Sequence, residues 1–228
     1  MRFTVDTDLL AAARRVLAAR ERLYWIVGGA GSGKTTICQN LSARFNLPVY
    51  DMDAHIYGAY HSRFTPERHP VNTAWAGAEN GLAWLLAMSW DEFDSFNRAA
   101  LAEYVDLLAE DLATQPRDAS LLIDGGICNP ALLAQVIPPR QIAGLAVPGL
   151  SSLDIWQGSA ERAAMQEMVV QLPAGEDAWR TFLAFDEAIT RTILAECSAA
   201  GIPICTRSAA EPVADVADRV ARVLGLQS

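Results

Sequence analysis

The chain has 228 residues, which is enough for one sizeable α/β domain and sets about two domains as an upper limit. Its net charge is −9 at neutral pH, with 27 acidic residues against 18 lysines and arginines. No basic run is present to neutralise a polyphosphate backbone, so the composition argues against general nucleic-acid binding and against binding to anionic membranes.

The N-terminal segment from Asp6 to Arg22 is amphipathic and contains acids, which predicts a packed surface helix rather than a signal peptide. No segment resembles an uninterrupted transmembrane helix. The four cysteines lie far apart without a C-x-x-C pair, and the three histidines fit no usual metal spacing. These features predict a cytoplasmic protein with reduced thiols and without a zinc site.

A glycine-rich loop follows the first predicted strand, the apolar run 23–27, and precedes a segment with helical spacing at 35–41. The loop matches the phosphate-binding pattern G-x-x-x-x-G-K-[ST]. Average residue usage produces this pattern by accident in roughly 1% of chains of this length. The predicted nucleotide-binding residues are Gly28, Gly29, Ala30, Gly31, Ser32, Gly33, Lys34, Thr35 and Thr36.

Lys34 is the only lysine in a chain that otherwise uses arginine. Lysine is a compact point charge on a flexible stem, whereas arginine is a planar fork, so its survival at this one position indicates a need for lysine. We predict that Lys34 neutralises charge on the transferred phosphoryl group and that the Thr35 hydroxyl binds Mg²⁺. The absence of a second lysine also excludes the Asn-Lys-x-Asp element that reads guanine in Ras-type GTPases, which favours ATP as the donor.

Strands and helices alternate along most of the remaining chain, which predicts a parallel sheet of about five strands covered on both faces. Further strands are expected at 47–51, 120–124, 141–147 and 202–206, and further helices at 131–136, 159–170, 177–200 and 213–224. The region 58–118 interrupts the alternation, with helical spacing at 72–88 and 91–111 and many aromatic residues. We expect this insertion to pack tightly on the body or to line a pocket.

Acidic and glycine residues follow the second and third predicted strands, where open α/β sheets gather their catalytic groups. With the phosphate loop and the helical insertion, this order resembles the P-loop small-molecule kinases, which include nucleoside monophosphate, shikimate and gluconate kinases. The resemblance covers nearly the whole chain in topology, is specific only at the phosphate loop, and matches no single member. It implies a single domain over residues 1–228 with a three-layer P-loop NTPase fold, an insertion at 58–118 that binds substrate, and ATP and Mg²⁺ as cofactors. The acidic and glycine residues concerned are Asp51, Asp53, Asp124, Gly125 and Gly126.

The resemblance implies a role for each of these residues. Asp53 would accept or orient the hydroxyl proton of the acceptor, and Asp51 would lie beside the substrate or assist the metal. The open alternative is that this Asp pair caps the helix that follows. Asp124 resembles a Walker B aspartate and would hold Mg²⁺. Gly125 and Gly126 resemble the glycines that contact substrate in shikimate kinases.

Arginines supply the remaining candidates. Arg63 and Arg68 are predicted to bind a phosphate or carboxylate of the acceptor, with a solvated loop as the alternative. By resemblance, residues 150–177 form a lid whose Arg162 stabilises transition-state charge. The alternatives there are Arg180 as the lid arginine, or a surface pair between Glu161 and Arg162. Arg207 follows the fifth strand, where these kinases pack a residue near the adenine.

These observations predict an ATP-dependent phosphotransferase that acts on a small-molecule acceptor. The aromatic insertion and the arginines favour a nucleoside or nucleotide, and a toxin-like kinase of sugar nucleotides is a subsidiary reading. The alternative from another class is a nucleotide-binding regulatory ATPase module whose insertion binds a protein partner. An acid within hydrogen-bond reach of an acceptor pocket discriminates between them, because a kinase needs one. The sequence does not indicate an oligomeric state.

Overall fold

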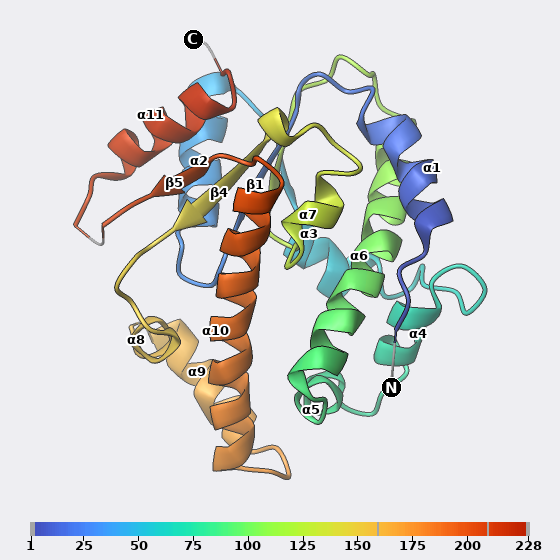
Figure 1. Cartoon of the computed structure of the whole chain (residues 1–228), viewed down its shortest axis with the longest axis vertical. Coiled ribbons are helices and arrows are strands. Elements are labelled where there is room, and N and C mark those ends of the chain that lie inside the picture. The colour runs from blue at the N-terminus through green and yellow to red at the C-terminus, as the bar shows by residue number, and fades with distance from the viewer. Residues whose placement is uncertain (1–2, 159, 209, 227–228) are drawn as a thin grey trace.

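The computed structural model describes residues 3–158, 160–208 and 210–226. Five strands form one sheet in the order β2-β3-β1-β4-β5, and every pairing is parallel (Figure 1). The predicted α/β class with a parallel sheet of about five strands is therefore confirmed. The strands are β1 (Leu23–Gly28), β2 (Val49–Asp51), β3 (Leu121–Asp124), β4 (Ile142–Ala146) and β5 (Ile204–Thr206).

Helices precede, connect and follow these strands (Figure 1). A single π-helical turn, η1 (His55–Ala59), continues the short helix α3, and a 3₁₀ turn, η2 (Pro139–Gln141), leads into β4. The α-helices are α1 (Thr7–Leu17), α2 (Lys34–Phe45), α3 (Met52–Ala54), α4 (Pro70–Ala76), α5 (Gly81–Leu86), α6 (Trp90–Ala113), α7 (Pro130–Leu133), α8 (Ser152–Gln157), α9 (Ala160–Val170), α10 (Glu176–Ala199) and α11 (Val213–Val223).

Both faces of the sheet are covered, which gives the domain three layers. Successive side chains of a strand point to opposite faces, so Trp25 and Val27 of β1 enter one core and Ile26 enters the other. The first core is closed by α1, α6 and α10, and the second by α2 and α11 (Figure 1). The apolar run of β1 therefore reflects burial on both sides.

The order in which strands are added to the sheet reverses at β1. From β1 the chain first builds β2 and β3 on one side, and later β4 and β5 on the other. In open α/β sheets, ligands bind outside the carboxyl ends of the strands at such a switch point. The loop that follows β1 lies at this position.

The inserted helices share the core of the domain. Instead of the single helix expected at 72–88, the chain forms α4 and α5, because the Asn80 side chain accepts a hydrogen bond from the Ala83 N–H at 2.9 Å and starts a new helix. A reciprocal capping box between Ser89 and Glu92 starts α6, which then packs along α1.

The segment 150–177 contains two helices where one was expected. The predicted helix 159–170 is present as α9, although Ser159 lies outside the described residues. The unpredicted helix is α8, which begins at a capping box formed by Ser151 and Asp154. Among the helices described, none has the length and apolar character needed to cross a membrane.

Candidate functional site

The glycine loop, residues 28–35, joins β1 to α2 and leaves the helix N-terminus uncapped by any side chain. Gly31 and Gly33 have φ values of 68° and 92°, in the left-handed region that glycine adopts readily. Gly33 occupies the capping position of α2 without a side-chain hydrogen bond, so the first N–H groups of the helix are available to an anion. Ser32 Oγ is buried and has no hydrogen-bond partner within the described part of the chain.

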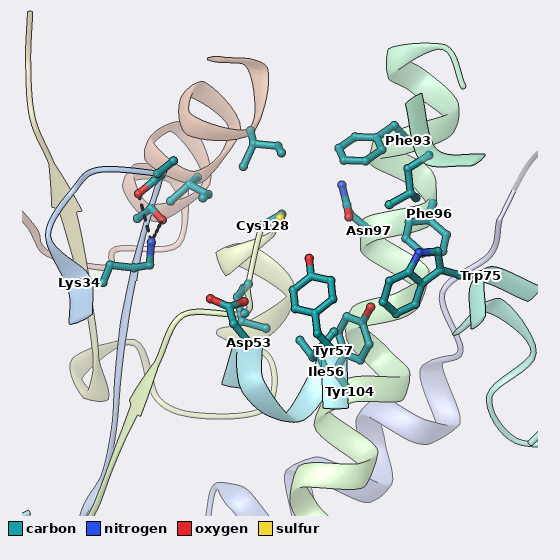
Figure 2. Close-up of a pocket in the computed structure, with 18 residues that line it drawn as sticks. Lys34, Asp53, Ile56, Tyr57, Trp75, Phe93, Phe96, Asn97, Tyr104 and Cys128 are labelled. Carbon is teal, nitrogen blue, oxygen red and sulfur yellow. Dashed lines mark hydrogen bonds between the residues drawn. The ribbon is translucent and has the colours of Figure 1, made fainter. Parts of the chain in front are cut away.

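Lys34 folds back across the loop (Figure 2). Its Nζ donates hydrogen bonds to the carbonyl oxygens of Gly28 at 2.7 Å and Gly29 at 3.1 Å. Thr35 and Thr36 are exposed in the first turn of α2. The loop therefore gathers the ammonium group, the helix N-terminus and a hydroxyl in the order expected of a phosphate site.

Two arginines from distant segments approach the same loop. Arg207, just after β5, donates from Nε to the Ser32 carbonyl at 2.8 Å and from Nη2 to the Gly31 carbonyl at 3.0 Å. Arg162 of α9 donates from Nη1 to the Ile155 carbonyl at 3.0 Å, and a Cβ placed on Gly31 would lie 3.1 Å from that nitrogen. The structure thus brings both predicted arginines to the glycine loop. Arg180 instead forms an ion pair with Asp177 on α10, and the Glu161 side chain lies outside the described part of the chain.

The predicted acids Asp51 and Asp53 lie in different environments. Asp53 lines a cavity at its glycine-loop end, and burial raises the pKa of its carboxyl, against the lowering effect of Lys34 (Figure 2). Asp51 is exposed, and its side chain accepts the Ala54 N–H at 2.9 Å. The capping alternative therefore describes the contact that Asp51 makes here, while Asp53 faces the cavity.

Asp124 ends β3 beside the loop and is 6% exposed. Its Oδ1 has no hydrogen-bond partner among the residues described, although leaving a buried acceptor unpaired costs about 1–3 kcal/mol. Burial and the neighbouring Asp124 carboxylate also raise the pKa of the Cys38 thiol. No group of three or more His, Cys, Asp or Glu side chains in the described ranges could hold a metal by itself. Mg²⁺ in phosphoryl-transfer sites typically takes one or two carboxylates and otherwise phosphate and water oxygens, so an unpaired Asp124 oxygen fits that ion.

Gly125 and Gly126 let α3 approach the end of β3. Their φ values are 73° and 74°. A Cβ on Gly125 would lie 2.6 Å from Asp53 Oδ2, and one on Gly126 would overlap the Met52 side chain. Gly126 lines the cavity, whereas Gly125 is not among the lining residues, so the contact made by Gly125 is with Asp53.

The cavity runs from the glycine loop into the aromatic insertion and has a volume of about 220 Å³ (Figure 2). Its wall on the insertion side is apolar and comes from α4, α5, α6 and α10. Cys128 also lines it, and burial raises the pKa of that thiol to about 12, which leaves it protonated at neutral pH. The apolar side chains of the wall are Trp75, Leu85, Phe93, Phe96, Tyr104, Ile189 and Ile193.

The structure does not bring Arg63 and Arg68 to this cavity. Arg63 donates to Asp111 at 2.6 Å and to Glu110 at 3.1 Å, and Arg68 pairs with Asp106 and with Glu110, both at 2.7 Å. Both arginines therefore bind acidic side chains of α6, which lie 38 to 48 positions further along the chain, rather than line the pocket.

Sequence reasoning missed three polar lining residues, Tyr57, Asn97 and Cys128. Tyr57 belongs to the π-helical turn η1, a deviation that recurs at functional sites but has no simple sequence signal. Asn97 did carry a signal. It lies four residues after Phe93, at a position where helical periodicity calls for an apolar side chain.

Comparisons with known proteins leave the family open. No family model matches the chain, and no curated protein matches it. Among solved structures, the chain is similar to one described as the crystal structure of TT1252 from Thermus thermophilus. The two are 16% identical with a TM-score of 0.46, and the match covers 92% of this chain and 99% of the other. A likeness at this level supports no statement about function.

Proposed function

We propose that the chain is an ATP-dependent phosphotransferase that moves the γ-phosphoryl group to a small-molecule acceptor, and that its fold is of the P-loop NTPase type. One observation carries the proposal: a single cavity joins the lysine of the glycine loop and the Asp53 carboxylate to an aromatic chamber (Figure 2). A phosphate-binding loop alone would serve an ATPase equally well. The chamber with Asp53 at its inner end supplies what transfer to an acceptor requires.

The roles of the residues follow from their positions. The N–H groups of the glycine loop and the N-terminus of α2 would bind the phosphates, and Lys34 would exchange its two carbonyl contacts for phosphate oxygens. Arg162, which approaches Gly31 from the segment 150–177, would add a positive charge near the transferred group. Arg207 donates its two hydrogen bonds to carbonyl oxygens of the glycine loop, so these bonds would hold the loop rather than bind the nucleotide.

Transfer would proceed at the inner end of the chamber. The acceptor oxygen forms a bond to the γ-phosphorus, the bond from that phosphorus to the bridging oxygen of ADP breaks, and the hydroxyl proton passes to Asp53. Because burial raises the pKa of Asp53, its carboxylate is a better base there than in water. Thr35 and Asp124 are the residues that would hold Mg²⁺, which would neutralise charge on the phosphates.

The Asp53→Asn variant tests this assignment. Asparagine preserves size but cannot accept the proton, so we expect transfer to fall at least about 100-fold while ATP affinity changes less than about threefold. The measurement combines calorimetric titration with ATP and a mass-resolved assay of phosphorylated acceptors from a metabolite panel. Asp118→Asn, an exposed substitution, serves as the matched control. Binding of ATP without any phosphorylated acceptor in the wild type would instead support the regulatory ATPase module.

A further inference from the structure

Charged side chains line only one end of the cavity. Of the residues that line it, Lys34 and Asp53 carry opposite charges at the glycine-loop end. The chamber beyond them is lined by rings and aliphatic side chains, and no arginine or histidine contributes to it within the described residues. An acceptor in the chamber would therefore meet no positive charge away from the reacting end.

Three arginines in or beside the helical insertion form ion pairs with acids on helices. Besides Arg63 and Arg68, Arg98 follows Asn97 directly and is paired with Asp94 and with Glu196, both at 2.6 Å. The Asp106 side chain is only 3% exposed, and a buried carboxylate that loses its partner is left uncompensated, so Arg68 in particular is held away from a substrate. A phosphate or carboxylate on the acceptor would lie unpaired against an aromatic wall.

Asn97 supplies the amide among the neutral polar groups that line the chamber, which otherwise are the hydroxyls of Tyr57 and Tyr104 and the Cys128 thiol. Figure 2 shows its amide between Phe93 and Phe96 on α6, directed toward the cavity. The amide makes no hydrogen bond to the part of the chain that the structure describes. It offers both a donor and an acceptor, which suits a neutral amide, carbonyl or nucleobase edge.

The volume limits the size of the occupant. A cavity of about 150 Å³ holds benzene, whereas drug-sized ligands occupy about 300–1,000 Å³. The cavity volume of about 220 Å³ lies between these values. One or two rings with a short hydroxyl-bearing arm would fill it, and aromatic side chains suit the flat faces of rings.

We propose that the acceptor is an uncharged alcohol built on one or two rings, with its hydroxyl at Asp53 and a neutral polar group on Asn97. This inference rests on the kinase function proposed above and narrows its substrate class. Of the acceptors expected from the sequence it retains a nucleoside with two rings, such as a pyrimidine nucleoside, and excludes the nucleotide, together with acidic sugars and other carboxylated acceptors. Asn97 is then a specificity residue that contacts the substrate.

Matched pairs that differ in charge test the inference with the full-length protein. One pair is 4-(hydroxymethyl)benzamide and 4-(hydroxymethyl)benzoate, and another is uridine and orotidine, which adds a carboxylate to the base and keeps the 5′-hydroxyl. Binding is measured by calorimetry with a non-hydrolysable ATP analogue and Mg²⁺ present, and transfer is measured separately with ATP. We expect the neutral member of each pair to bind at least about tenfold more tightly, because a charged group is costly to bury unpaired.

Variants connect the preference to Asn97. Asn97→Leu keeps the branched four-atom skeleton and removes the amide, so we expect the affinity for the benzamide to fall about 10-fold or more while that for benzyl alcohol is unchanged. Gln135→Leu, an exposed substitution outside the cavity, is the control. A second variant, Asn97→Arg, should reverse the preference toward the benzoate, which a purely structural asparagine would not do.

The outcomes separate this inference from the proposed function. Binding and phosphorylation of the anionic members in preference to the neutral ones would overturn the inference and leave the kinase function standing. Selective binding of the neutral members without transfer to any of them would support the chamber's selectivity and count against the kinase function. Failure of both members of every pair to bind would overturn the inference.

Discussion

Lys34 occupies a position that arginine cannot fill in the same way. Its single nitrogen reaches two adjacent carbonyl oxygens, those of Gly28 and Gly29, within one tight loop. A guanidinium group is wider and planar, and Arg207 and Arg162 already approach the neighbouring Gly31. A point charge on a flexible stem therefore suits this position both sterically and electrostatically.

We expect Lys34→Arg to reduce phosphoryl transfer nearly as much as Lys34→Ala, by about 100-fold or more, because charge alone does not reproduce the placement of the ammonium group. The assay is the rate of ADP formation with the preferred acceptor, together with the melting temperature to verify folding. Arg140→Lys, an exposed change, is the control. Near wild-type turnover by Lys34→Arg would contradict the role given to this residue.

Among the elements, the end of α6 depends on one buried arginine. Arg20 is 2% exposed and donates to the carbonyl oxygens of Gln115 and Pro116, both at 2.9 Å, and to that of Leu112. Burial lowers the pKa of its guanidinium, and no carboxylate forms an ion pair with it within the described ranges. Three carbonyl groups, one in the last turn of α6 and two just beyond the helix, thus take the place of a counter-ion.

Arg20→Met should lower the free energy of unfolding by about 2–4 kcal/mol, because it removes the donor from one buried and two partly buried hydrogen bonds to carbonyl groups. Arg15→Met, on the exposed face of α1, should cost less than about 1 kcal/mol. Urea denaturation of both variants measures the difference. Equal effects of the two substitutions would show that the carbonyl contacts of Arg20 contribute little.

The glycine loop and α10 are also coupled by close packing. A Cβ on Gly29 would overlap the Thr190 side chain. We expect Gly29→Ala to destabilise the fold by about 1–3 kcal/mol, and Thr190→Ala to relieve part of that cost when the two are combined. A double-mutant cycle by denaturation provides the coupling energy. Strictly additive effects of the two substitutions on the free energy of unfolding would mean that the loop and α10 can move apart without cost.

Much of this fold could be predicted from the sequence, because the buried strands and long helices have strong apolar periodicity. The break between α4 and α5 could not, since it depends on a single cap at Asn80 within an otherwise helical pattern. The glycine loop was predicted from local spacing alone. The partners of Arg63 and Arg68 are tertiary, and the sequence gives no local sign that α6 would bind both. The pocket residues Tyr57 and Asn97 depend likewise on how η1 and α6 meet.

At the scale of the whole molecule, one arginine connects the last helix to the end of the sheet and to the loop between them. Arg219 of α11 forms a bidentate pair with Glu211 and donates to the Thr206 carbonyl at 2.7 Å. This arginine lowers the pKa of the Glu211 carboxyl below its usual value. Because this pKa is lower in the folded state, the Glu211 carboxylate stabilises the fold at pH values above its pKa in the unfolded chain, which is about 4.3. That stability is lost as the pH falls through the pKa of the folded state.

Glu211→Gln should therefore be less stable than the wild type at neutral pH, with the difference shrinking as the pH falls from about 5 toward 3. Thermal unfolding across this range measures it, and Glu67→Gln, an exposed change, is the control. A difference that stays constant with pH would mean that the Glu211 charge is not what stabilises this contact.

The most direct measurement of the central claim follows the γ-phosphoryl group itself. The protein is mixed with Mg²⁺ and ATP carrying an oxygen-18 label on the γ-phosphate, together with the neutral alcohols described above, and the products are resolved by mass. We predict that the label appears in a phosphate ester of an acceptor with the wild type, and that Asp53→Asn leaves it in ATP. Label recovered only as inorganic phosphate, at equal rates for the wild type and Asp53→Asn, would contradict the account.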